Sequence, residues 1–475
     1  MDYEAVIGLE THVQLKTKSK MWCGCANEFG AAPNTHVCPV CLGLPGVLPV
    51  ANEEALRLTA LTGLLLNCEV RRYAKFDRKN YFYPDMPKNY QITQYDQPST
   101  LSGYVDFEFA GGISRVRITR AHLEEDVGKN FHFDRNSGVD FNRAGVPLME
   151  IVSEPDLSSA DMAYEYLNAL KDLLVYGGVS DCDMEKGMVR CDVNVSVRPR
   201  GQTELGAKIE IKNMNSFSGV RKALEYEIPR QIDVLKKGGK LIQSTRRWDD
   251  VAGITEEMRT KEHAHDYRYF PEPDLMPFEP TEPWLGEVRQ RVVELPLARK
   301  QRFMRDYQLP AADAQTFVWD VPLGNYFEGI AKQAKNPKAA ANWVINNLRA
   351  KMTEAGVTLT ELKFSPSAIL ELIDLVDGGK ISSKIAQEVF AEVFATGESP
   401  AKIVQKKGLA QVSDTSALEQ FCDQAIAANP GPAADFRSGK AAALNFLKGQ
   451  VMKLSKGKAN PALVGEILER KLKGS

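Results

Sequence analysis

Alternating apolar and polar positions mark several segments of the N-terminal half as β-strands. Residues 6–15, Val-Ile-Gly-Leu-Glu-Thr-His-Val-Gln-Leu, follow a period of two, which is the side-chain period of a strand. Residues 189–198 and 208–212 repeat the alternation. We expect these segments to be neighbours in one antiparallel sheet that buries its apolar face. The other face would carry Glu10, His12, Asp192 and Glu210, with basic residues interleaved.

Helical spacing of apolar residues predicts helices over 53–66 and 220–238, and beyond residue 294 it replaces the strand pattern altogether. Serine–proline pairs predict further helix starts at 365–366 and 399–400, and glycines predict turns at 378, 397, 408 and 457. The stretch 79–98, rich in tyrosine, proline and amides, fits neither period. It is predicted to be an irregular loop that grips a ligand, with a packed surface loop as the alternative.

These patterns predict an α+β protein of three parts: a sheet-containing domain over 1–293, a helical domain over 294–407 and a small helical tail over 408–475. The composition of 475 residues, 43% hydrophobic and 26% charged, is typical of a soluble multidomain protein. With no N-terminal leader pattern and no apolar run of bilayer length, we expect a cytoplasmic protein that is not bound to a membrane.

Charge is distributed unevenly along the chain, whose net charge is only −2. Residues 437–475 hold nine Lys or Arg against two acidic residues. A local positive excess of this kind favours contacts with RNA phosphates, although a solvated helix face is the alternative. The candidate contacts are Lys440, Lys448, Lys453, Lys456 and Lys458.

Four of the eight cysteines lie close together in the sequence, as Cys23, Cys25, Cys38 and Cys41. Their spacing, C-x-C-x12-C-x2-C, places soft ligands on short turns and favours a structural tetrahedral zinc. Free thiols are the alternative, and His36 is close enough to replace one cysteine.

Carboxylates in apolar surroundings indicate a second, harder cation site. Glu124 and Glu125 follow an apolar strand pattern, and Glu150 lies within the apolar run 146–152. A buried carboxylate must either be protonated or bind a cation. Together with the sheet face, these residues suit Mg-ATP, because carboxylates bind the metal while arginine and lysine bind phosphate oxygens. Further phosphate contacts could come from Arg246, Arg247 and Arg268, whose alternative is solvated salt bridges. No P-loop, G-x-G-x-x-G or H-E-x-x-H motif occurs.

Several segments together resemble the GatB family, one of the subunit families of bacterial aspartyl/glutamyl-tRNA amidotransferases. They are residues 6–15, the Cys23–Cys41 cluster, Lys-Phe-Asp-Arg-Lys-Asn-Tyr-Phe-Tyr-Pro-Asp at 75–85, Asp-Phe-Asn-Arg-Ala-Gly-Val-Pro-Leu-Met-Glu-Ile-Val-Ser-Glu-Pro-Asp at 140–156 and Asp-Tyr-Arg-Tyr-Phe-Pro-Glu-Pro-Asp at 266–274. The tail segments 439–453 and 456–461 resemble the YqeY-type module of the same family.

The resemblance implies a cradle domain with an antiparallel sheet akin to that of glutamine synthetase, a helical domain and a tRNA-binding YqeY-like tail. It implies that ATP phosphorylates the side-chain carboxylate of mischarged Glu-tRNA(Gln) or Asp-tRNA(Asn), after which ammonia displaces phosphate. A GatA-type glutaminase subunit would supply the ammonia, and a GatC-type small subunit would complete the heterotrimer. The lack of a convincing nucleophile here agrees with that division, since Ser382-Ser383-Lys384 lies where serines cap a helix.

By analogy with the family's metal site, Mg2+ is assigned to His12, Glu125 and Glu150, whereas Zn2+ is assigned to the four cysteines from their spacing. Glu10, Glu124, Asp192 and Glu210 would form an acidic group that holds ATP-linked metal and accepts a proton from ammonium. Lys79 and Arg190 are the expected phosphate contacts. Two alternatives stay open: a stand-alone metal-dependent ATP amide ligase for a small amino acid, and a non-catalytic tRNA-binding scaffold.

Overall fold

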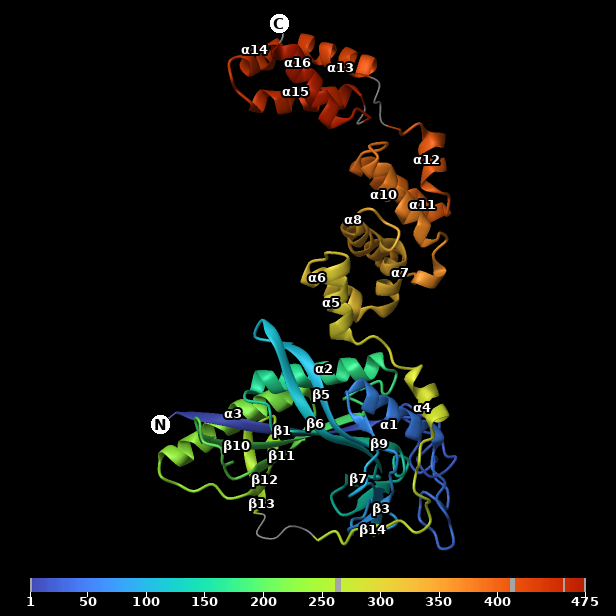
Figure 1. Cartoon of the computed structure of the whole chain (residues 1–475), viewed down its shortest axis with the longest axis vertical. Coiled ribbons are helices and arrows are strands. Elements are labelled where there is room, and N and C mark those ends of the chain that lie inside the picture. The colour runs from blue at the N-terminus through green and yellow to red at the C-terminus, as the bar shows by residue number, and fades with distance from the viewer. Residues whose placement is uncertain (1, 261–265, 411–414, 456–457, 474–475) are drawn as a thin grey trace. The chain divides into compact units, whose positions relative to one another are not determined.

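The computed structural model describes residues 2–260, 266–410, 415–455 and 458–473 (Figure 1). The chain divides into two compact units, residues 1–297 and 298–475. The domain limits expected at residues 293 and 407 stay predictions. Among the described residues, no helix is both long enough and apolar enough to cross a bilayer.

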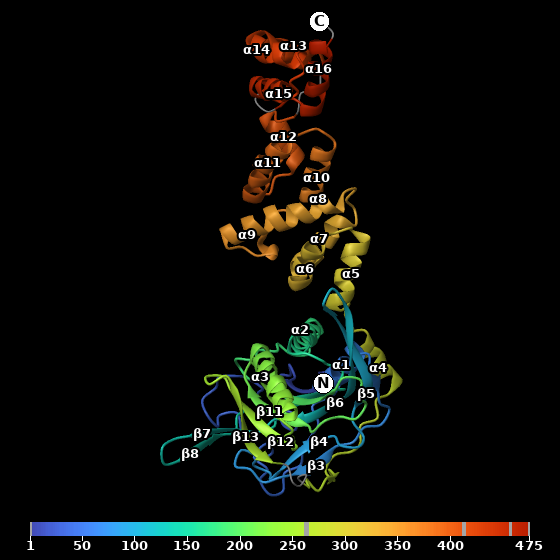
Figure 2. The same ribbon diagram turned by 90° about the vertical axis from the view of Figure 1, so that its left-hand side faces the viewer.

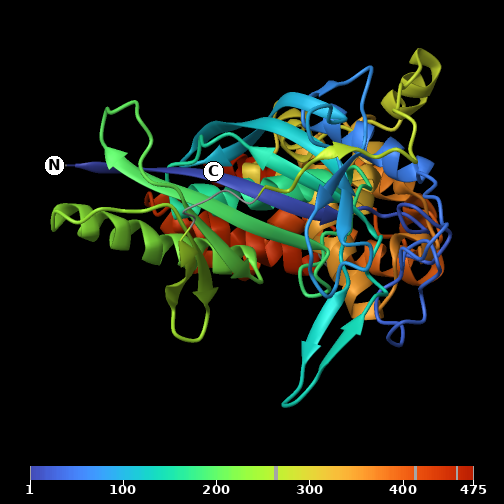
Figure 3. The same cartoon turned by 90° about the horizontal axis from the view of Figure 1, so that it is seen from below.

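A nine-stranded sheet forms the frame of the first unit, with β1 near its middle (Figure 3). All neighbouring pairs are antiparallel except β11 and β12, which are parallel. The predicted sheet is thereby confirmed, and it is mixed at this one pair. In spatial order the strands are β13 (Ile254–Thr260), β12 (Ser244–Asp249), β11 (Ile209–Met214), β10 (Val189–Pro199), β1 (Tyr3–Gln14), β9 (Pro147–Ser153), β6 (Gly112–Glu125), β5 (Thr100–Phe109) and β2 (Glu69–Val70).

Two long helices, α2 (Ala160–Tyr176) and α3 (Phe217–Lys236), cover one face of this sheet (Figure 2). Alternation along β1 places Leu9 and Val13 in the core with Leu170 of α2. Serine side chains cap both helices by accepting a backbone hydrogen bond within the first turn. The shorter helix α1 (Glu53–Leu65) packs on β5 and β6, and α4 (Glu282–Arg289) packs on α1.

The prediction of an irregular loop over 79–98 is partly wrong, because residues 90–93 form a strand. β4 (Tyr90–Thr93) pairs with β3 (Asp77–Asn80), and β14 (Phe270–Pro271) completes a three-stranded sheet on the other edge of β3. Backbone pairing with β3 outweighs the low strand propensity of this polar segment. A separate hairpin is formed by β7 (Lys129–His132) and β8 (Ser137–Asp140), and it projects from the large sheet (Figure 2).

The second unit is helical and has two separate apolar cores. The first is built around Phe317 and Phe327, whose rings stack at 4.2 Å, and the second contains Leu447 and Leu468. Helices of the first core are α5 (Pro296–Asp306), α6 (Ala311–Trp319), α7 (Val321–Ala331), α8 (Pro337–Asn342), a π-helical turn (Trp343–Leu348), α9 (Arg349–Ala355), a 3-10 turn (Leu359–Glu361), α10 (Pro366–Asp377), α11 (Ser383–Thr396) and α12 (Pro400–Lys407). The second core is formed by α13 (Thr415–Ala428), α14 (Pro430–Arg437), α15 (Ala442–Leu454) and α16 (Pro461–Lys473).

The predicted ends of these helices agree with their observed caps. α10 and α12 start with proline directly after a serine, and they end at Gly378 and Gly408. Ser382 caps α11 by accepting a hydrogen bond from the Ile385 amide, and Gly397 ends that helix with a φ of +78°. Such a positive φ favours glycine because it has no Cβ. Gly457 lies outside the described residues.

Candidate functional site

Register across the large sheet places an imidazole and several carboxylates on the face opposite α2 and α3. His12 on β1 lies opposite Glu150 on β9 and Arg190 on β10. Glu150 in turn lies opposite His122 on β6, and Glu124 follows two residues later on the same face. Directly opposed residues share a face, so three strands converge on one acidic cluster.

His12, Glu124 and Glu150 form the tightest part of this cluster. The Nε2 atom of His12 lies 3.3 Å from Oε2 of Glu150 and 3.5 Å from Oε1 of Glu124. One ligand atom from each of the three residues lies within 4.8 Å of the others, which is a separation that one cation can bridge. We name these three residues the His12 cluster.

Burial and neighbouring charge shift the titration of these groups in opposite directions. Burial by itself lowers the pKa of His12, but the hydrogen bond with Glu150 and the charges of Glu124 and Glu150 outweigh it and raise the pKa to about 9. Burial raises the pKa of Glu124 to about 7, against the effect of His12. Burial also tends to raise the pKa of Glu150, but His122 and His12 outweigh it and hold this pKa below its usual range. Without a cation, the protonated His12 therefore offsets part of the negative charge of the two carboxylates.

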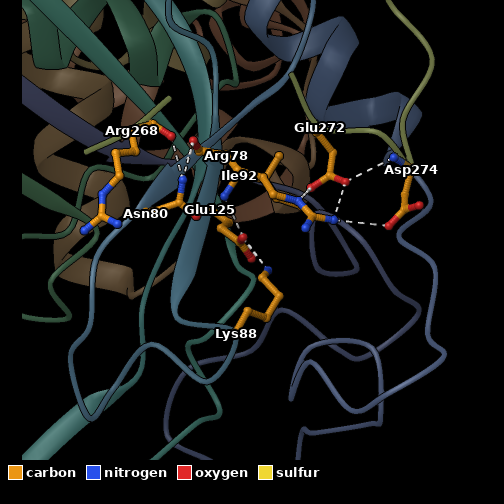
Figure 4. Close-up of polar contacts among 8 residues, drawn as sticks. All are labelled: Arg78, Asn80, Lys88, Ile92, Glu125, Arg268, Glu272 and Asp274. Atoms are coloured by element: carbon orange, nitrogen blue, oxygen red, sulfur yellow. Dashed lines mark hydrogen bonds and ion pairs between the residues drawn. The ribbon is translucent and has the colours of Figure 1, made fainter. Parts of the chain in front are cut away.

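Glu125, the expected third magnesium ligand, lies outside the His12 cluster. Its carboxylate accepts hydrogen bonds from Lys88 Nζ and from the Ile92 amide, the latter at 2.9 Å (Figure 4). The side chain is only 2% exposed. Successive side chains of a strand point in opposite directions, so Glu124 and Glu125 cannot both face His12. The structure therefore brings Glu124, and not Glu125, beside His12, and the magnesium role expected for Glu125 stays a prediction.

Asp192 and Glu210 form a second group around Lys212, and Glu10 lies on the same sheet face. Lys212 Nζ contacts Asp192 and lies 3.0 Å from Oε1 of Glu210. Thr245 donates to Glu210 at 2.9 Å, and Asn194 donates to Glu10 at 2.8 Å. Burial tends to lower the pKa of Lys212, yet Asp192 and Glu210 hold it above its usual range. The expectation that these acids share a face with basic residues agrees with the register of β1, β10 and β11.

The two expected phosphate contacts differ in their surroundings. Burial tends to lower the pKa of Lys79, but the nearby carboxylates of Glu124 and Glu150 raise it, so this ammonium is electrostatically coupled to the His12 cluster. The Lys79 Nζ also lies 5.0 Å from the ring centre of Tyr267. Arg190 instead donates to buried Asp126 at 2.8 Å.

The guanidinium groups of Arg246 and Arg247 are engaged within the protein, whereas the contacts of Arg268 are made by its backbone. Arg246 and Arg247 are bound within the sheet, to Thr255 and Glu256. The backbone carbonyl of Arg268 accepts a hydrogen bond from Asn80 (Figure 4). Their expected role as phosphate contacts stays a prediction.

His122 lies beside the His12 cluster and was not singled out from the sequence. It is 3% exposed, and its Nε2 lies 3.9 Å from Glu150. Continuing the period of two would have found His122, which is two residues before Glu124.

Lys212 was expected only as one of the interleaved basic residues of the sheet face. The sequence did not indicate its position between Asp192 and Glu210.

The four cysteines come together as a second candidate metal centre. Their Sγ atoms all lie within 4.8 Å of one another, and each cysteine is a free thiol. Four sulfurs bound to one zinc at about 2.3 Å would lie roughly 3.8 Å apart, so the donor set and its spacing fit zinc. A hydrogen bond from Cys23 lowers the pKa of Cys41 to about 4, and the charge of Lys20 acts in the same direction. His36 is not among the grouped ligands, and its backbone amide donates to the side chain of Asn142.

The tail lysines are distributed over more than one surface. Lys440 and Lys453 are exposed, and Lys440 contacts Asp435 at 2.9 Å. The charged end of the Lys448 side chain packs against Gly465 of α16. Lys458 is half-buried, and Lys456 lies outside the described residues. The assignment of these residues to RNA stays a prediction.

The fold and these clusters define an α+β protein with a sheet-borne acidic site, a four-cysteine centre and a helical C-terminal half. A model of the GatB/GatE catalytic domain matches residues 5–286, and a model described as the GatB domain matches residues 325–472. The chain belongs to the GatB family.

Full-length relatives support this membership. The GatB-type aspartyl/glutamyl-tRNA(Asn/Gln) amidotransferase subunit of Carboxydothermus hydrogenoformans is 53% identical over 476 residues, which cover 99% of either chain. The protein of the same name from Methylacidiphilum infernorum is 54% identical, over 100% of this chain and 99% of its own. That from Thermoanaerobacter sp. (strain X514) is 51% identical, over 99% of this chain and 100% of its own. The predicted family is confirmed, and with it the class of amidotransferase subunits.

Proposed function

We propose that this chain amidates the side-chain carboxylate of mischarged Glu-tRNA(Gln) or Asp-tRNA(Asn), using ATP and ammonia from a partner subunit. Full-length similarity to proteins named as subunits of aspartyl/glutamyl-tRNA(Asn/Gln) amidotransferase supports the substrate class. The observation that carries the site assignment is the convergence of His12, Glu124 and Glu150 within 4.8 Å.

The His12 cluster is the proposed magnesium site, with Glu124 in the position expected for Glu125. Two carboxylates and an imidazole suit a hard divalent cation. When bound, the ion would neutralise repulsion between a phosphate chain and a substrate carboxylate. Lys79 adds a fixed positive charge beside Glu124 and Glu150, where it can hold a phosphate oxygen.

A pocket beside Glu10 is the proposed site of the nucleoside. Its volume is about 200 Å3, and its wall includes Val6, Val152, Pro155 and Leu205. Glu10 and Asn194 lie at its polar edge. An apolar pocket next to a carboxylate cluster allows a base to bind while its phosphates extend toward the His12 cluster.

The proposed reaction has two steps. A carboxylate oxygen of the substrate takes the terminal phosphoryl group of ATP, which forms an acyl phosphate and ADP. Ammonia then attacks the acyl carbon, the C–O bond to phosphate breaks, and the amide forms with loss of one proton. Glu10, Asp192 and Glu210 are the candidate proton acceptors, and the Lys212 ammonium contacts the last two. Ammonia comes from a GatA-type glutaminase, with a GatC-type protein in the same complex.

The experiment compares Glu124→Gln with Glu165→Gln in the complete complex. Glu165 is an exposed acid on α2, and its variant controls for loss of one negative charge. Glu124→Gln is expected to abolish ATP-dependent amidation while charged tRNA still binds. Unchanged amidation in that variant would contradict the metal assignment. Equal amidation of free glutamate or aspartate would instead favour the stand-alone ligase.

A further inference from the structure

Lys20 is fully buried, although lysine is seldom found inside a protein without a charged partner. Its exposed fraction is 0%. In the part of the chain that the structure describes, no carboxylate lies within ion-pair distance of its Nζ. An isolated ammonium in such a place would be strongly destabilising. The contacts of the Nζ atom therefore show which group can balance this charge.

The groups around Lys20 belong to the four-cysteine centre. Its Nζ lies 3.7 Å from Sγ of Cys41 and 3.3 Å from the carbonyl oxygen of Phe141. The backbone amide of Lys20 donates to the carbonyl of Cys25 at 3.0 Å. Both ends of the residue thus contact the cysteine loops.

Charge explains why an ammonium belongs at this position. A divalent zinc bound by four thiolates carries a net charge of −2. Cys41 is itself 4% exposed, so water does little to stabilise the charge there. A buried ammonium beside one sulfur offsets part of this charge and donates a charge-assisted hydrogen bond.

We propose that Lys20 is a positioning residue of the zinc centre, which it holds by neutralising the thiolate of Cys41 and anchoring it to the carbonyl of Phe141. This inference rests on the proposed zinc occupancy of the four cysteines. On this inference, Lys20 influences the affinity for zinc although it is not one of the metal ligands.

The same contacts connect the zinc centre to the acidic sheet face. Phe141 begins a turn that leads into β9, the strand that carries Glu150. The Met21 amide, next to Lys20, donates to the carbonyl of Gly145 at 2.7 Å. Gly145 has a φ of +83°, and a Cβ there would lie 3.5 Å from the Cβ of Cys41. Lys20 therefore holds the cysteine loop against the turn that positions β9.

The test measures zinc affinity of the full chain in its complex, by competition with a chromophoric chelator. Lys20→Met keeps the apolar stem and removes the charge, and it is expected to weaken zinc binding by about 10- to 100-fold. Lys18→Met removes an exposed charge from the same loop and is expected to leave the affinity unchanged. Lys20→Arg keeps the charge and should recover part of the lost affinity.

A spectroscopic measurement separates this role from mere packing. In the Co2+-substituted protein, loss of the hydrogen bond to Cys41 should move the sulfur-to-metal charge-transfer band to longer wavelength. A lower melting temperature of Lys20→Met with an unchanged zinc affinity and an unchanged band would overturn the proposal.

Two further outcomes are also decisive. If the unchanged protein binds no zinc, the proposed zinc occupancy fails first, and the role of Lys20 fails with it. If Lys20→Met does not fold, amine acylation of the unchanged protein replaces it. Lys20 should then become reactive once a chelator removes the zinc, and equal protection with and without zinc would overturn the proposal.

Discussion

Glu124 and Glu125 are consecutive residues of β6, yet their carboxylates serve two different networks. Glu124 lies 3.5 Å from Nε2 of His12, whereas Glu125 accepts hydrogen bonds from Lys88 and the Ile92 amide. The first network belongs to the proposed metal site. The second joins the large sheet to β4 of the three-stranded sheet (Figure 4). This separation makes the two residues distinguishable by experiment.

Glu125→Gln is expected to destabilise the fold and to leave magnesium affinity unchanged. Glu124→Gln is expected to weaken magnesium binding and to leave the stability of the fold unchanged. Removing the charge of Glu125 leaves the Lys88 ammonium, 8% exposed, without its partner. Breaking a buried pair in this way costs about 3 kcal/mol. Chemical denaturation in chelator and magnesium titration of the same two variants measure the two effects. Weaker magnesium binding in Glu125→Gln at full stability would restore Glu125 to the ligand set.

The three-stranded sheet has a second anchor in Arg78. Its guanidinium donates to both carboxylate oxygens of Glu272, at 2.7 and 2.8 Å, and contacts Asp274 (Figure 4). Arg78→Lys keeps the charge but loses the paired geometry. Since Lys79 is the next residue of β3, we expect a higher KM for ATP together with a lower melting temperature. Arg117→Lys, whose exposed arginine forms a comparable pair with Asp156, is the control and should change neither quantity.

Stability in the absence of metal should depend on pH through His12. The pKa of His12 is about 9 in the folded protein and about 6.5 when unfolded. Because the pKa is raised in the folded state, protonated His12 contributes its full stabilisation of the fold below pH 6.5. This contribution is lost as the pH rises through 9. Its size is on the order of 3 kcal/mol. Unfolding of chelator-treated protein at pH 6 and pH 10 measures it, and His12→Gln should remove most of the difference.

Periodicity predicted the sheet face from sequence because burial of one face fixes the register of every strand. The positions of Glu10, His12, Asp192 and Glu210 follow from that rule. It could not decide between Glu124 and Glu125, because both side chains are buried at the end of β6, where a segment including β4 approaches. That choice depends on a long-range contact with a segment whose strand character was not visible in its composition. Lys20 was missed for the same reason, since its partner Phe141 is far away in the sequence.

Zinc should be present at about one ion per chain, since the four cysteines form one tetrahedral set. Cys38→Ser is expected to lower the zinc content and the melting temperature, because binding of the metal contributes to folding of the loop. Glu28→Gln changes an exposed residue of the same loop and should alter neither quantity. Elemental analysis and thermal denaturation provide the measurements. A zinc-free protein with an unchanged melting temperature would show that the cysteines are ordinary thiols without a structural metal.

Binding of tRNA should depend on the exposed lysines of the tail and on salt. Lys440 and Lys453 are exposed, and each phosphate contact that is lost should lower the slope of log affinity against log salt by about 1. Replacing both with alanine is expected to weaken tRNA binding at low salt and to flatten that slope by about 2. The matched control replaces Lys332 and Lys338, two exposed lysines outside the tail, with alanine. An unchanged slope in the tail variant, measured by filter binding with charged tRNA, would place the RNA contacts on another part of the chain and make the basic excess of the tail a solvated surface.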